Sequence, residues 1–165
     1  MAITILHGLK AELGPEDRLL GLDVGSKTVG LALSDVTRTI ATPYRTLRRT
    51  TFAKDAESLR RTIDEHGVGG LVIGLPLQMD GTEGRRCQSV RRFAANLLEG
   101  MDIPIAFWDE RLSTAAVERV LIREADMSRR RRAQVIDKAA AAYILQGALD
   151  ALAGAAGGGR NTKER

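Results

Sequence analysis

The chain has 165 residues, of which 44% are hydrophobic, 4% aromatic and 28% charged, with a formal net charge of +4. This length suits one domain with an aliphatic core, and the basic balance suits a polyanionic partner without requiring one. The single cysteine, Cys87, excludes an internal disulfide, and no run approaches the roughly 20 apolar residues that span a bilayer. We therefore expect a cytoplasmic protein with no membrane partner.

The first third of the chain predicts three antiparallel strands. Residues 1–17 hold a short apolar piece and then Gly14-Pro15, which breaks regular structure, so we expect an N-terminal extension there. Residues 18–24 and 28–34 are apolar runs joined by a tight turn, which predicts a hairpin. Residues 40–47 predict a third strand, in which Pro43 favours an edge position or an early end.

The rest of the chain alternates between strands and helices. Short apolar runs at 71–73 and 103–108 predict two more strands, the first covered on both faces. Apolar residues at helical spacing predict helices over about 52–66, 87–100, 113–121 and 135–152. This order predicts an α/β fold in which helices flank a mixed sheet. The glycine-rich and then charged residues 154–165 predict a disordered tail.

Three carboxylates stand at points where this layout gathers chain segments. Asp23 ends the first strand, and Glu110 follows the strand over 103–108, with Asp109 beside it. If those strands are parallel neighbours, their C-terminal ends share the edge at which open sheets bind ligands. Asp137 begins the last helix and can lean towards that edge, although an ordinary surface aspartate is the alternative.

A cluster of carboxylates implies a cation, because neighbouring negative charges repel one another unless something neutralises them. Carboxylate oxygens are hard ligands, which suit Mg²⁺ or Mn²⁺. Two such cations promote the in-line hydrolysis of a phosphodiester. We therefore expect Asp23, Glu110 and Asp137 to be both the metal ligands and the catalytic residues of a two-metal-ion nuclease.

Basic residues accompany these carboxylates along the chain. Lys27 lies in the turn after the first strand and Arg111 follows the fifth, so both are candidates to bind phosphate groups beside the site. Arg85 follows a loop rich in glycine and polar residues, and Arg129 and Arg130 begin a run of arginines. All three are candidates for contact with a nucleic acid. Ordinary surface charge is the alternative for each of these residues.

Four motifs in order closely resemble the YqgF family, which is also called the RuvX or Holliday-junction-resolvase-like family. They are Asp23-Val-Gly-Ser-Lys27 with Gly30, Ala32, Ser34 and Asp35, then Gly74-Leu-Pro76, then Asp109-Glu-Arg-Leu-Ser-Thr114, then Asp137-Lys-Ala-Ala-Ala-Ala-Tyr-Ile-Leu-Gln146. The resemblance implies a ribonuclease H-like fold, related to RuvC resolvases, with a mixed sheet of five strands. It also implies a cytoplasmic nuclease that uses Mg²⁺ or Mn²⁺ to trim the 5′ end of the 16S ribosomal RNA precursor.

The same resemblance places the acidic positions of the family at Asp23, Glu110 and Asp137, with Asp109 as the alternative to Glu110. It implies that residues 18–153 form one ribonuclease H-like nuclease domain between the extension at 1–17 and the tail at 154–165. The expected partner is pre-16S ribosomal RNA, or else branched DNA, and the expected state is a monomer or a homodimer.

Three other functions compete with this prediction. A DNA-junction resolvase would use the same chemistry but needs a dimer with paired sites. A non-catalytic factor would bind RNA or RNA polymerase without cutting anything. Sugar kinases and actin-like ATPases also place an Asp-x-Gly hairpin around nucleotide phosphates, but they need two such domains, and this chain has the length of one.

Overall fold

The computed structural model describes residues 3–112 and 129–157, without the side chains at 129, 130, 132, 133 and 155–157. The described strands form one six-stranded sheet in the order β1-β6-β5-β2-β3-β4. Strands β1, β6, β5 and β2 are parallel to one another, whereas β3 and β4 are antiparallel to their neighbours. The strands are β1 (Ile3–Thr4), β2 (Arg18–Val24), β3 (Thr28–Ser34), β4 (Ala41–Arg48), β5 (Val68–Leu75) and β6 (Ile105–Asp109).

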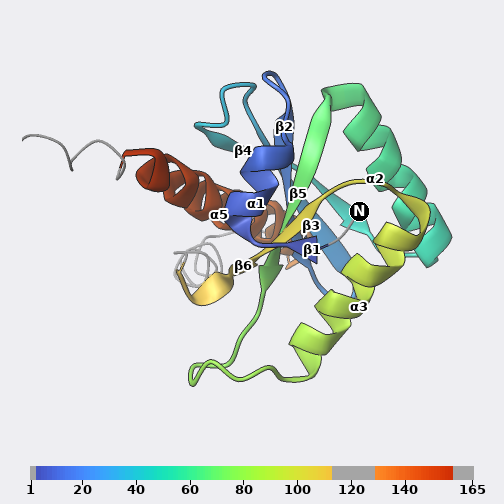
Figure 1. Ribbon diagram of the computed structural model, residues 1–165. Coiled ribbons are helices and arrows are strands. Elements are labelled where there is room, and N and C mark those ends of the chain that lie inside the picture. The colour runs from blue at the N-terminus through green and yellow to red at the C-terminus, as the bar shows by residue number, and fades with distance from the viewer. Residues whose placement is uncertain (1–2, 113–128, 158–165) are drawn as a thin grey trace, which may run out of the picture.

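Helices cover both faces of this sheet (Figure 1). Helices α2 (Phe52–His66) and α3 (Arg85–Gly100) pack on one face, and α1 (Leu6–Glu12) and α5 (Arg129–Gly157) pack on the other. A short 3₁₀ helix, η1 (Glu110–Leu112), follows β6 directly. None of the helices in the described ranges is long and apolar enough to cross a membrane.

The alternation of side chains along β2 divides the core into two layers. Leu20 and Leu22 point towards α2 and α3, whereas Leu19 points towards α5. Since successive side chains of a strand point to opposite faces, Asp23 projects on the same side as Leu19. Asp23, near the C-terminal end of β2, therefore faces α5.

The predicted mixed α/β fold is confirmed, and several local predictions agree with the structure. Gly67 ends α2 with φ 62°, a left-handed conformation that glycine adopts without strain. The strand that contains Pro43 lies at one edge of the sheet, where the missing N–H costs no ladder hydrogen bond. The run at 71–73 lies within β5, between β2 and β6, and is fully buried.

The number of strands differs from the five that were predicted, because the N-terminal residues join the sheet. Strand β1 pairs with β6, aligning Ile3 with Ile105, and Leu9 of α1 is completely buried. A strand of two residues is too short to give a periodic pattern in the sequence. It pairs because β6 has a free edge on the side away from β5. Helix α5 begins before the predicted start at about residue 135 and continues past the predicted boundary at residue 153. Asp137 therefore lies within the helix and not at its beginning. The helix predicted at 113–121 and residues 158–165 lie outside the described residues.

Candidate active site

Asp23 lies between two glycines of the neighbouring strands. It pairs with Gly30 on β3, and the pairing of Leu22 with Ile73 places Gly74 of β5 on its other side. Side chains opposite one another on adjacent strands point to the same face. Both neighbours lack a side chain, so the space on each side of Asp23, which is 7% exposed, is left to other parts of the chain.

Asp137 occupies the space over Gly30. A Cβ atom at Gly30 would collide with the backbone carbonyl group of Asp137, so α5 rests directly on β3 at this glycine. The hydroxyl of Thr28, two residues earlier on β3, donates a hydrogen bond of 2.6 Å to the Asp137 carboxylate. The strand therefore holds both the backbone and the side chain of Asp137 beside Asp23.

Glu110 occupies the space over Gly74. Its Oε1 atom lies 2.7 Å from the position that a Cβ atom of Gly74 would take. The neighbouring Asp109 is engaged elsewhere, because its carboxylate accepts hydrogen bonds from the Arg111 side chain, the shortest 2.6 Å, and from the Arg111 backbone N–H. These bonds hold the pKa of Asp109 below its ordinary value. The geometry favours Glu110 over Asp109 as the third carboxylate of the site.

Asp137 and Glu110 thus lie over the two glycines that flank Asp23, near the C-terminal ends of β2 and β5, on the face covered by α5. Adjacent strands lie about 4.8 Å apart, so residues placed over both neighbours of Asp23 are within reach of it. Each of these three acidic residues interacts with another group of the protein. Across the described ranges, no group of three or more His, Cys, Asp or Glu side chains is arranged to hold a metal ion. The three carboxylates therefore lie near one edge of the sheet, but their oxygens are not arranged as the ligands of one metal ion.

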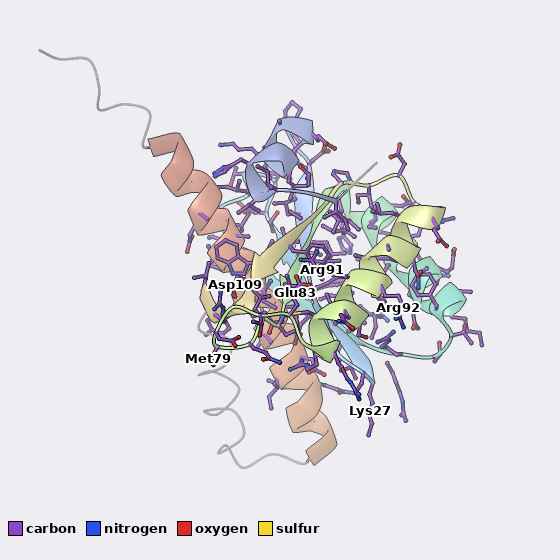
Figure 2. All side chains as sticks on the ribbon, turned by 60° about the horizontal axis from the view of Figure 1, so that its bottom comes forward. Lys27, Met79, Glu83, Arg91, Arg92 and Asp109 are labelled. Carbon is purple, nitrogen blue, oxygen red and sulfur yellow. The ribbon has the colours of Figure 1, made fainter. Side chains whose placement is uncertain are left out.

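The predicted phosphate-binding residues take different places. Lys27 is exposed in the β2–β3 turn and lines a cavity together with Asp137. Arg111 donates to Asp109 and to the carbonyl oxygen of Met79, at 3.3 Å, and so links η1 to the loop over 76–84. In the view of Figure 2, Met79 lies to the left of the start of α3 and Lys27 lies to its right.

The remaining predicted nucleic-acid contacts are less defined. Arg85 is exposed at the first residue of α3. Arg129 and Arg130 begin α5, but their side chains lie outside the part of the chain that the structure describes. The sequence reasoning did not identify Thr28 or Arg86, which line the same cavity as Lys27. For Thr28, the only local signal in the sequence is its position two residues before Gly30. For Arg86, the only signal is its charge.

Fold comparison identifies the class of protein. The chain is similar to Thermus thermophilus RuvC, solved in complex with a Holliday junction substrate, with a TM-score of 0.53 and 12% identity, over 84% of this chain and 96% of that chain. A likeness at this level of identity concerns the fold alone. It places the chain among proteins with the ribonuclease H-like fold.

Sequence comparison identifies the family. A family model described as "RuvX: Holliday junction resolvase" matches residues 17–151, and the chain belongs to this family. A relative from Paramagnetospirillum magneticum is 68% identical over 142 residues, which cover 86% of this chain and 91% of that protein. A relative from Phenylobacterium zucineum is 56% identical over 153 residues, covering 92% and 98% respectively. Both are named "Putative pre-16S rRNA nuclease".

Proposed function

We propose that this protein is a nuclease that hydrolyses phosphodiesters of RNA, and that its substrate is the 5′ end of the 16S ribosomal RNA precursor. The observation that carries the proposal is the placement of Asp137 over Gly30 and of Glu110 over Gly74, the two glycines that flank Asp23. The names of the relatives from Paramagnetospirillum and Phenylobacterium support RNA as the substrate class.

The donor atoms suit a hard divalent cation. All three side chains offer carboxylate oxygens, and Cys87 is buried in the core between α3 and the sheet, on the other face. Oxygen ligands without cysteine or histidine favour Mg²⁺ or Mn²⁺ over zinc. Asp23, Glu110 and Asp137 would hold these ions. When bound, such ions supply charge that activates a water molecule and stabilises the leaving oxygen of the cleaved strand.

The chain's own residues prepare the site for that chemistry. Thr28 fixes the orientation of the Asp137 carboxylate by its hydrogen bond. Arg111 occupies Asp109, so that the carboxylate turned towards the site from this segment is that of Glu110. The absence of side chains at Gly30 and Gly74 leaves the space in which these carboxylates approach Asp23. Such positioning before substrate binds is a large part of catalytic rate enhancement.

Branched DNA is the second candidate substrate, because the family model carries the description of a Holliday junction resolvase. Symmetric cleavage of a junction requires two sites related by a two-fold axis. A side-by-side assay of a precursor transcript and a four-way DNA junction, with the oligomeric state measured in the same buffer, separates the two candidates.

The central test is the substitution Asp23→Asn, which keeps the shape of the side chain and removes its charge. We expect RNA cleavage in Mg²⁺ or Mn²⁺ to fall by roughly a thousand-fold while the fold survives, since several kcal/mol of transition-state stabilisation are lost. Asp64→Asn, at an exposed acid of α2 on the opposite face of the sheet, is the matched control and should cleave normally.

Two results would contradict the proposal. Full cleavage by Asp23→Asn would remove the carboxylates from the mechanism. A wild-type protein that binds RNA but leaves both RNA and branched DNA intact, over a range of metal and salt concentrations, would favour the non-catalytic binding factor instead.

A further inference from the structure

A cavity of about 590 Å³ lies beside the carboxylates, between the β2–β3 turn and the first turns of α3. Ser26 and Lys27 line it from the turn, and Arg86 and Ser89 line it from the helix. Asp137 forms part of the same wall. The cavity therefore shares one carboxylate, that of Asp137, with the candidate active site.

The polar groups of this cavity suit an anion. Lys27 and Arg86 bring two positive charges, and the hydroxyls of Ser26 and Ser89 can donate hydrogen bonds. Within the described ranges, neither Lys27 nor Arg86 forms an ion pair, whereas Arg91 pairs with Glu83. Cations that have no acidic partner and face a cavity favour phosphate groups, which accept charge-assisted hydrogen bonds from them.

Arg49 holds the two walls of the cavity at a fixed separation. Its side chain donates to the carbonyl oxygen of Gly25 at 2.7 Å, and its backbone N–H donates to the carbonyl oxygen of Lys27 at 2.8 Å. The same guanidinium lies 5.3 Å from the ring centroid of Phe93 on α3, within the range of a cation–π contact. One residue, directly after β4, thus contacts both the turn and the helix that line the cavity.

We propose that this cavity binds a backbone phosphate of single-stranded RNA next to the phosphodiester that is cut. Lys27 and Arg86 contact the phosphate, and Arg49 is a positioning residue that keeps the turn and the helix in place. The proposal rests on the nuclease function proposed above, because Asp137 belongs to both the cavity and the site. A strand that has one phosphate at the carboxylates would place a neighbouring phosphate in the cavity.

RNA binding by the full chain tests the two phosphate contacts. In an Asp23→Asn background, which prevents cleavage, the affinity for a fluorescein-labelled single-stranded RNA is measured in Mg²⁺ at several KCl concentrations. Lys27→Ala and Arg86→Ala should each weaken binding about tenfold and reduce the slope of log K against log salt by about 0.7. Arg92→Ala is the matched control, because Arg92 is exposed on the same helix but lies outside the cavity (Figure 2).

The role of Arg49 has a different signature. Arg49→Ala should weaken RNA binding while leaving the salt slope unchanged, because Arg49 positions the walls and does not touch the phosphate. Thermal unfolding of each variant confirms that the measured protein is folded. A reduced salt slope in Arg49→Ala would show direct phosphate contact and would overturn the positioning role.

The outcomes separate this proposal from the nuclease proposal. If Asp23→Asn abolishes cleavage but Arg86→Ala and Arg92→Ala bind RNA alike, the nuclease proposal stands and the cavity is ordinary basic surface. If the wild-type protein cuts nothing while Arg86→Ala loses affinity and Arg92→Ala does not, the phosphate cavity stands and the nuclease proposal fails.

Discussion

Both faces of the sheet bury leucines and isoleucines, but the face under α5 also carries more glycine and alanine. The face under α2 and α3 buries large residues of both the sheet and the helices, such as Leu22, Leu59 and Phe93. The face under α5 carries glycine at positions 21, 30 and 74 of the strands and many alanines on the helix. Large side chains keep a helix at a distance, whereas glycine and alanine let the backbones approach.

This difference explains why the candidate site lies on the α5 face. The face under α2 and α3 carries the larger cluster of buried apolar residues, and such burial stabilises the fold. On the face under α5, the backbone of Asp137 lies against Gly30 and the carboxylate of Glu110 lies over Gly74. Small residues on this face therefore serve the placement of functional groups more than the burial of apolar area.

The largest expected effect comes from Gly30→Ala. The new Cβ atom would collide with backbone atoms of Asp137, which cannot move away without displacing α5. We expect the free energy of unfolding to fall by about 3 kcal/mol or more, and cleavage to be lost with it. Chemical denaturation measures the first effect and the RNA cleavage assay the second.

Gly154→Ala is the matched control for that substitution, because Gly154 lies in α5 and, apart from the backbone of its own helix, no atom of the described residues lies within 4 Å of the added Cβ. Alanine has the higher helix propensity, so this variant should be as stable as the wild type or more stable by up to about 1 kcal/mol. Equal effects of the two substitutions would mean that close packing on the α5 face is unimportant.

A smaller effect on stability but a clear effect on activity is expected from Gly74→Ala. Its Cβ atom would meet the ends of two flexible side chains, Cδ1 of Ile144 at 2.5 Å and Oε1 of Glu110 at 2.7 Å. Both ends can move, so the free energy of unfolding should fall by only about 1 kcal/mol. Displacement of Glu110 should nevertheless slow cleavage by roughly a hundred-fold.

Gly70→Ala separates these two effects. Gly70 lies on the same strand, and the three atoms nearest to its Cβ would be the apolar side-chain ends of Leu9 at 2.8 Å, Leu19 at 3.1 Å and Leu13 at 3.3 Å. We expect a similar loss of stability with normal cleavage per folded molecule. A comparable loss of activity in Gly70→Ala would indicate that strain in β5, rather than the position of Glu110, limits the reaction.

The smallest expected effect concerns the pH dependence of stability through Asp109. Hydrogen bonds from Arg111 lower the pKa of Asp109 below its usual value of 3.8. A carboxyl whose pKa is lowered by folding adds stability above its unfolded pKa and loses that contribution as the pH falls through the folded pKa. Asp109→Asn should therefore lower the melting temperature slightly near neutral pH, and the difference should vanish in strong acid.

A double-mutant cycle checks the cause of this small effect. In an Arg111→Ala background, Asp109→Asn should change the melting temperature much less than in the wild type. An undiminished effect would show that Arg111 is not the partner that matters for the stability contributed by Asp109.

Much of the fold followed from local patterns. The predicted helix over about 52–66 ends before Gly67, because glycine adopts a left-handed conformation readily. Pro43 favours an edge strand because it has no N–H to donate, and it lies on the edge strand β4. Strands β2 and β6, which lead to Asp23 and Glu110, are parallel but are not the neighbours that the prediction considered, because β5 lies between them. Their C-terminal ends still lie at one edge of the sheet, as the rule for parallel strands requires. In each case a single residue type limits what its neighbours can do.

Other features depended on contacts between distant segments. Nothing local showed that residues 3–4 would pair with β6, or that Arg86 would face Lys27 across a cavity. The choice of Glu110 over Asp109 also depended on a partner, because Arg111 binds the carboxylate of Asp109. In the sequence, the two adjacent acidic residues are equivalent candidates. In the folded protein, one of them is paired with a basic side chain and the other is not paired with that side chain.

By itself, the sequence determined the fold class and the family and predicted three acidic residues for the site, because periodicity, glycines and short motifs are local properties of the chain. Only the tertiary structure decided how those residues meet: Gly30 admits α5, Gly74 admits Glu110, and Arg49 joins a turn to a helix. Such close approaches depend on the shapes of two surfaces at once, and one strand or helix carries the shape of only one of them.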